Sequence, residues 1–210
     1  MTAREAILSA VRGRARMVTR PVYRHERAVD PVTHFVAKAK GSYAQLHEAA
    51  RLDEVPETVL ALLVSAGAEL RLHVSKDSQL RALPWQRVPG LALSAAPPSG
   101  EASALSMADF AIAETGTLAF VSGASKPSSW HFLPGREVVL VNRASILPAL
   151  EDVFRALAAT GLPSTLNLVT GPSRTGDIEQ RIQLGAHGPR RLHVVLVDQA
   201  ETATDGPPGS

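Results

Sequence analysis

A polar turn that carries one carboxylate interrupts the apolar run between residues 110 and 120. Ala111-Ile-Ala113 leads into the tetrapeptide Glu114-Thr-Gly-Thr117, and Leu118-Ala-Phe120 leads out of it. A charge beside buried structure is costly unless a partner group or a ligand compensates it. Two interpretations are open for Glu114: a catalytic carboxylate exposed at a strand end, or a structural one that accepts hydrogen bonds from its own turn and neighbouring loops. We favour the structural interpretation.

A second polar segment, residues 171–190, connects two predicted strands. Ligands of open α/β sheets bind beyond the carboxyl ends of strands. The glycine amides, the hydroxyls and Arg174 or Arg190 of this segment could hold a carboxylate or a phosphate. His187 lies between two glycines, where it could carry a proton, donate a hydrogen bond to an anion or simply fix a turn. Across both segments the candidate ligand-binding residues are Glu114, Thr115, Gly116, Thr117, Gly171, Ser173, Asp177, Glu179, His187 and Arg190, and Glu114 is also the catalytic candidate.

Several common motifs are missing from the sequence. Gly171-Pro-Ser173 is not followed by Gly-Lys-Ser/Thr, and no Gly-x-Gly-x-x-Gly follows a predicted strand, so a nucleotide site has little support. A triad of Ser173, His187 and an acid is disfavoured because no Gly-x-Ser-x-Gly elbow surrounds the serine. The histidines are not spaced as metal ligands, so we predict no metal site. We expect His73 and His193, which alternate with apolar strand residues, to be satisfied at the sheet surface.

Alternating helices and strands must position the two polar segments. Hydrophobic periodicity predicts a helix over residues 32–40, a helix with Pro56 in its first turn and Gly67 past its end, and a helix over 146–157 that Ser145 caps. The predicted strands cover residues 69–74, 138–141, 166–170 and 192–197, while residues 43–47 fit helix or strand. This order predicts an α/β fold with a mainly parallel central sheet flanked by helices.

The length of the chain and its 45% hydrophobic content fit one domain. We predict a basic N-terminal arm over residues 1–30, a folded domain over 31–198 and a disordered tail over 199–210. The first forty residues hold nine lysines and arginines against three acids, a charge that could meet an acidic protein, a neighbouring subunit or nucleic acid. We favour a partly ordered, solvated leader over nucleic-acid binding, since few aromatic residues accompany the charge.

The sequence contains no cysteine, which excludes thiolate nucleophiles and cysteine-ligated iron–sulfur or zinc sites on these residues. Any redox centre would therefore lie on another molecule, and we predict no cofactor on this chain. Neither a run of 18 apolar residues nor a signal-peptide pattern occurs. We therefore expect a cytoplasmic protein without a membrane span.

Two blocks of sequence stand out in order and spacing. The first block is Ala108–Thr117, and the second comprises Gly171–Ser173, Asp177–Glu179 and Gly185–Val197, with Leu133-Pro134 and Val138–Val141 between them. Together they resemble the LUD domain of the lactate utilization protein C (LutC/YkgG) family. The resemblance extends from about Pro31 to Val197. It implies a sandwich fold like that of the NagB/RpiA/CoA-transferase group, and it favours a strand at residues 43–47. Between the blocks, Lys126 and Trp130 stand in a segment where the family often has an arginine, so ligand preference could differ.

The resemblance also implies a role in oxidising L-lactate to pyruvate, beside iron–sulfur partner proteins. We therefore expect an accessory, non-catalytic component that binds a small carboxylate or another anion, or that assembles the redox partners. Two alternatives stay open. Fold analogy suggests a stand-alone enzyme of CoA-transferase or sugar-phosphate isomerase type that uses Glu114, and the basic arm suggests an interaction or regulatory protein.

Overall fold

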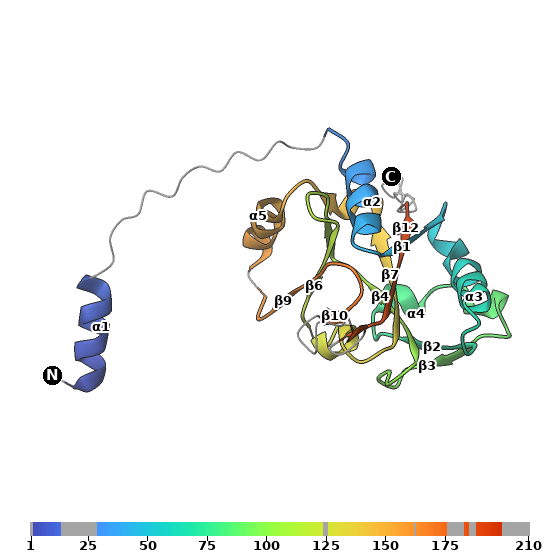
Figure 1. The fold of residues 1–210 in the computed structure, drawn as a ribbon, viewed down its shortest axis with the longest axis horizontal. Helices are drawn as coiled ribbons and strands as arrows, with labels where there is room; N and C mark the ends of the chain where they lie inside the picture. The colour runs from blue at the N-terminus through green and yellow to red at the C-terminus, as the bar shows by residue number, and fades with distance from the viewer. Residues whose placement is uncertain are drawn as a thin grey trace, which may run out of the picture.

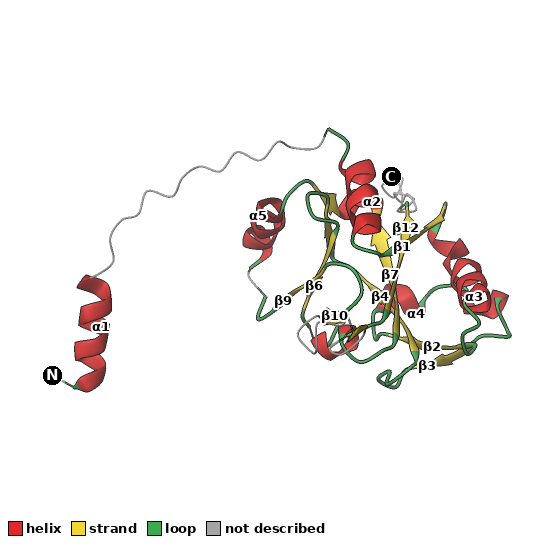
Figure 2. Cartoon of the chain, viewed as in Figure 1, coloured by secondary structure: helices red, strands yellow, loops and turns green. Residues whose placement is uncertain are grey.

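The computed structural model describes residues 2–13, 29–123, 126–161, 163–175, 183–184 and 188–198. Figure 1 and Figure 2 show the arrangement of its helices and strands. The helices are α1 (Ala3–Gly13), α2 (Pro31–Gly41), α3 (Val55–Ser65), α4 (Ser78–Arg81) and α5 (Leu150–Thr160), with 3-10 turns η1 (Leu52–Glu54), η2 (Trp85–Arg87), η3 (Ser128–His131) and η4 (Arg143–Ser145). The strands are β1 (Gln45–Ala49), β2 (Arg71–Val74), β3 (Ala92–Ser94), β4 (Ser103–Met107), β5 (Phe110–Ile112), β6 (Thr117–Val121), β7 (Arg136–Asn142), β8 (Ile146–Leu147), β9 (Leu166–Val169), β10 (Arg174–Thr175), β11 (Gln183–Leu184) and β12 (Arg191–Val197).

Six strands form the main sheet, in the order β1-β12-β7-β4-β2-β3, and every neighbouring pair is parallel. The predicted α/β fold with a mainly parallel central sheet is therefore confirmed. The two longest strands, β7 and β12, lie side by side near the middle. Their apolar runs are continuous rather than alternating, as expected of strands that are covered on both faces, and residues 138–141 are fully buried.

The two faces of the main sheet carry different layers, which Figure 1 shows on opposite sides of β7 and β12. On one face, Val59 and Leu63 of α3 and Leu80 of α4 pack against alternate residues of the sheet such as Val138. On the other face, Phe35 of α2 and parts of a second sheet pack against the intervening residues. Burying each large apolar side chain of this kind contributes about 1.5–3 kcal/mol.

The second sheet has four strands in the order β8-β5-β6-β9. Strands β5 and β6 are antiparallel, as are β6 and β9, whereas β5 and β8 are parallel. Helix α5 covers its outer face through Val153 and Leu157, which contact Ile112. The structure thus places the predicted strand over residues 166–170 in this second sheet, as β9.

Local signals explain where most elements begin. The Asp30 side chain caps α2 by accepting hydrogen bonds from the backbone N–H groups of Val32, at 3.1 Å, and Thr33, at 3.3 Å. The helices predicted over residues 32–40 and around Pro56 are confirmed, and residues 45–49 form a strand. The predicted boundaries of the arm, domain and tail stay predictions, because residues 14–28 and 199–210 lie outside the described residues.

The helix predicted over residues 146–157 is present, but its predicted start is wrong and Ser145 does not cap it. Helix α5 begins at Leu150, and Ile146–Leu147 form β8 beside β5. Pro148 explains the difference, since the residue before a proline is disfavoured in helical geometry. The Ser145 hydroxyl instead donates to the backbone oxygen of Asn142 at 2.8 Å. Of the helices that the structure describes, none combines the length and apolar character needed to cross a membrane.

Candidate functional site

The Glu114–Thr117 turn joins β5 to β6 and packs against the last turn of α2. Gly116 has a φ of 70°, and a Cβ at this position would lie 2.6 Å from the carbonyl carbon of Lys38 and 2.8 Å from the Cα of Ala39. Only glycine fits both the left-handed backbone and this close approach. The turn is therefore a support for α2, whatever else it does.

The second polar segment meets the first at the same place. The hydroxyl oxygens of Thr117 and Thr170 are 2.6 Å apart, which joins the turn to the end of β9. Gly171 has a φ of 74°, and a Cβ there would collide with the carbonyl oxygen of Ser42, just past α2. The two blocks that resemble the LUD domain thus come together on the end of one helix.

Other predicted site residues have separate surroundings. The Glu114 amide donates to the carbonyl oxygen of Pro148 at 3.1 Å, and its side chain is half-buried. Ser173 donates its amide to the carbonyl of Pro189, and Arg190 forms an exposed ion pair of 2.7 Å with Glu101. Asp177, Glu179 and His187 lie outside the described residues. The catalytic role considered for Glu114 and the ligand-binding role of the predicted set stay predictions.

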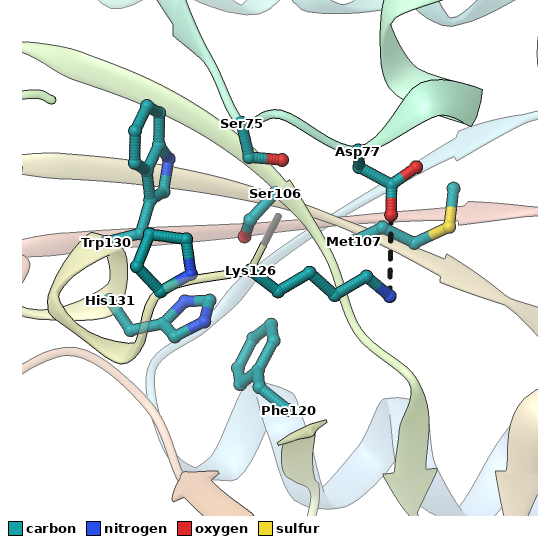
Figure 3. A pocket seen from close by; sticks show the side chains of 9 residues that line it. Ser75, Asp77, Ser106, Met107, Phe120, Lys126, Trp130 and His131 are labelled. Carbon is teal, nitrogen blue, oxygen red and sulfur yellow. Dashed lines mark ion pairs between the residues drawn. The ribbon is translucent and has the colours of Figure 1, made fainter. Parts of the chain in front are cut away.

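A partly open cavity lies between the main sheet and the second sheet, with about 10 Å³ of space for the centre of a water molecule, which is room for about one water. It borders the carboxyl ends of β2 and β4, where ligands bind in open α/β sheets. Figure 3 shows the Lys126 side chain extending across it toward Asp77. The lining residues are Ser75, Asp77, Ser106, Met107, Phe120, Lys126, Pro127, Trp130 and His131.

Two carboxylates hold the Lys126 ammonium group in this cavity. Its Nζ is 2.7 Å from Asp109 Oδ1 and 3.4 Å from Asp77 Oδ2. Burial lowers the pKa of Lys126, but the hydrogen bond and charge of Asp109, together with Asp77, outweigh it and raise the pKa above its ordinary value. The side chain is therefore charged at neutral pH. Because an ammonium has three N–H donors, one can still point toward a ligand.

Beside the lysine, a buried carboxylate orients a histidine. Glu137 is fully buried, and its Oε1 lies 2.6 Å from His131 Nδ1. The same oxygen accepts a hydrogen bond of 2.7 Å from the Ser106 hydroxyl, while the Phe120 ring stacks on the imidazole at 3.7 Å between centroids. A carboxylate only accepts, which assigns the proton to Nδ1 and leaves Nε2 of a neutral ring as a base. This pair can position a proton acceptor at the cavity.

Two buried polar atoms of this cluster have no hydrogen-bond partner among the described residues: Trp130 Nε1 and Glu137 Oε2. Trp130 is only 4% exposed, yet it lines the cavity. In Figure 3 its indole nitrogen lies on the side of the ring that faces Ser75. An unsatisfied buried donor costs about 1–3 kcal/mol, which an oxygen atom of a ligand in the cavity would offset.

His131, Glu137 and Ser106 are site residues that the sequence alone does not predict. One signal was available, because Glu137 is a charged residue immediately before the apolar run 138–141 of a buried strand. Lys126 and Trp130 were noted only as a departure from the family pattern. Among the described residues, no group of three or more His, Asp or Glu side chains could hold a metal ion.

Comparison with known proteins shows which family part of this domain is similar to. Residues 102–197 match the model of the LUD domain, so the predicted resemblance is confirmed over this range. A solved structure of a DUF162 family protein from Deinococcus radiodurans has the same fold, with a TM-score of 0.58 and 22% identity, over 80% of this chain and 96% of that chain. Seven of the nine cavity residues fall within the matched range.

Particular relatives are proteins described as lactate utilization protein C. That of Halalkalibacterium halodurans is 35% identical over 99 residues, which cover 45% of this chain and 43% of the relative. That of Bacillus subtilis is 33% identical over 98 residues, or 44% of this chain and 41% of the relative. The chain thus spans less than half the length of the curated relatives that it matches.

Proposed function

We propose that this protein is an accessory component of an L-lactate oxidation system and that its cavity binds a small 2-hydroxy or 2-oxo carboxylate. The observation that carries the proposal is a buried, unsatisfied indole N–H that lines the same cavity as a charged ammonium, inside the range that matches the LUD domain. The similarity to lactate utilization protein C supports the choice of lactate and pyruvate as ligands.

The cavity has room for about one water molecule as it stands, so binding requires the Lys126 side chain, which crosses the cavity, to turn toward the entering ligand. Each group of the ligand then has a suitable neighbour. The carboxylate would accept hydrogen bonds from Trp130 Nε1 and Lys126 Nζ, of which the second is charge-assisted. A methyl group would lie against Met107 and Phe120, which line the apolar part of the cavity. The 2-hydroxyl group would donate to His131 Nε2, held in place by Glu137.

Oxidation of lactate to pyruvate also releases a pair of electrons, for which these residues supply no acceptor. The sequence contains no cysteine to ligate an iron–sulfur cluster. We therefore place the acceptor on iron–sulfur partner proteins, with this chain holding the carboxylate and, at His131, a proton. The reaction balances if both electrons pass to the partners, the hydroxyl proton passes to His131, and the second proton, from the C2–H bond, passes to a base on the partners or to solvent.

Ligand binding can be tested with the purified chain. We expect calorimetric titration with L-lactate and with pyruvate to show binding that Lys126→Met weakens by about tenfold or more, since one charge-assisted hydrogen bond is lost. Lys40→Met is the matched control, because Lys40 is exposed on α2 and should bind like the unmodified protein. Equal affinities for the two variants would contradict the proposal.

The place in an oxidation system needs a second experiment. Lactate-dependent reduction of an acceptor dye should be measured for the iron–sulfur partners with and without this chain. We expect the complete mixture to be the more active. Activity that does not change when the chain is left out would remove the accessory role, even if the cavity binds lactate.

A further inference from the structure

A row of basic and polar side chains lies on the opposite face of the main sheet from the cavity. Arg136 begins β7, and the strand register places it between Ser103 of β4 and Arg191 of β12. Residues in register on parallel strands point to the same face, and alternate residues along one strand do so too. His193 therefore shares this face. Farther along the strands, Val138 and Val195 lie on the same face and pack against α3.

Arg136 is buried without a matching negative charge. It is 5% exposed, its Nη1 donates to the Ser103 hydroxyl at 3.2 Å, and its Nε has no hydrogen-bond partner. No ion pair joins it to a carboxylate in the part of the chain that the structure describes. Arginine is rarely buried unless it is paired, because an uncompensated charge in the interior is costly.

The neighbours of Arg136 add to this imbalance. Burial and the charge of Arg191 lower the pKa of Arg136, and Glu101 opposes them only in part. Glu101 is itself engaged, since it pairs with Arg190 at the surface. Like charges on directly neighbouring strand positions destabilise a sheet. A bound anion would offset the repulsion between Arg136 and Arg191.

His193 carries a second unsatisfied atom into the same row. It is 2% exposed, and its Nδ1 lies 3.1 Å from His47 Nε2, while its Nε2 has no partner among the described residues. The expectation that His193 is satisfied at the sheet surface is therefore wrong. Burial, aided by His47 and both arginines, lowers the pKa of His193 to about 4. The imidazole is neutral at neutral pH, and one of its nitrogens can donate to an anion.

We propose that Arg136, Arg191, Ser103 and His193 form a binding site for a phosphate group. Neighbouring strands are about 4.8 Å apart, so guanidinium groups in register can engage one tetrahedral oxyanion. Their planar arrays of donors match phosphate oxygens in pairs, and two positive charges suit a dianion better than a monocarboxylate. The site is distinct from the lactate cavity, because the main sheet separates them.

Titration of the full chain with inorganic phosphate, followed by calorimetry and by the imidazole NMR signals, tests the site. We expect phosphate to bind and to shift the His193 signals. Arg191→Met, at an exposed position, should weaken binding by about tenfold or more. Arg155→Met, which removes an exposed arginine on α5, should bind like the unmodified protein. Arg136→Met is less informative, since it also alters the core.

Parallel titrations with pyrophosphate and with a sugar phosphate identify the source of the phosphate group. Tighter binding of either than of inorganic phosphate supports an organic or condensed phosphate as the ligand. An acidic peptide provides the opposing arm. The proposal is overturned if millimolar phosphate does not bind, if Arg191→Met and the unmodified chain bind equally, or if only the peptide binds.

Discussion

The most informative perturbation of the LUD-like blocks is Gly116→Ala, because the structure supplies a matched control. Both Gly116 and Gly67 have left-handed backbones, with φ values of 70° and 57°. A Cβ at Gly67 would meet nothing within 4 Å, whereas at Gly116 it would meet backbone atoms of Lys38 and Ala39. Comparing the two alanine variants therefore separates the cost of backbone conformation from the cost of displacing α2.

The expected losses of stability follow from these two costs, that of the backbone conformation and that of displacing α2. A left-handed backbone costs an L-residue about 1–2 kcal/mol, which both variants should lose. Overpacking a core contact costs about 1–3 kcal/mol more, which only Gly116→Ala should lose. We expect urea unfolding to give losses in the free energy of unfolding of about 1–2 kcal/mol for Gly67→Ala and about 2–5 kcal/mol for Gly116→Ala. Equal losses would refute the view that the Glu114–Thr117 turn holds α2 in place.

Three further predictions concern individual charges. Asp77→Asn should tighten the binding of L-lactate about fivefold in a calorimetric titration, because it frees Lys126 from a competing carboxylate. Asparagine can still cap α4, so the fold should be kept. Weaker binding would count against Lys126 as the ligand's partner. Glu114→Gln should leave that affinity unchanged, because Glu114 does not line the cavity, and a large loss would revive the alternative of an enzyme that uses this carboxylate. His193 becomes protonated below about pH 6.5 in the unfolded state but only at about pH 4 in the folded state. The free energy of unfolding should therefore fall as the pH drops through this window, by about 2 kcal/mol between pH 7 and pH 5. His193→Asn should lose this component in urea unfolding, whereas His34→Asn, at an exposed position, should keep it.

The elements that the sequence predicts correctly are those with local signals. Asp30 and Pro31 define the start of α2, and Pro56 and Gly67 bracket α3. The strands β7 and β12 contain continuous apolar runs, residues 138–141 and 194–197, as expected of parallel strands that are covered on both faces. In each case a few residues that are neighbours in the sequence determine the backbone conformation, so the sequence pattern is sufficient to predict the element.

The second sheet could not be predicted in the same way. Strands β5 and β8 have three and two residues, too short for a periodic pattern. Pairing within this sheet also joins distant segments, such as Leu118 of β6 with Val169 of β9. The misplaced start of α5 follows from this, because Ile146 fits the helical pattern but pairs instead with Ala111.

The candidate cavity escapes sequence analysis for a related reason. His131 and Glu137 meet only because η3 leads into β7, and Lys126 reaches Asp77 only because the two sheets pack face to face. None of these residues forms a motif along the chain. The two blocks that sequence comparison finds most readily instead meet at the end of α2, where their glycines have a packing role.

The central claim is that the cavity binds a small carboxylate, and the indole N–H signals test it most directly. The chain has two tryptophans. Trp130 Nε1 has no partner among the described residues, whereas Trp85 Nε1 donates to the carbonyl of Leu80 at 2.9 Å and serves as an internal control. In a proton–nitrogen correlation spectrum, we expect L-lactate or pyruvate to shift the Trp130 indole signal and to leave that of Trp85 in place. A Trp130 signal that does not move at saturating concentrations of both acids would contradict the account.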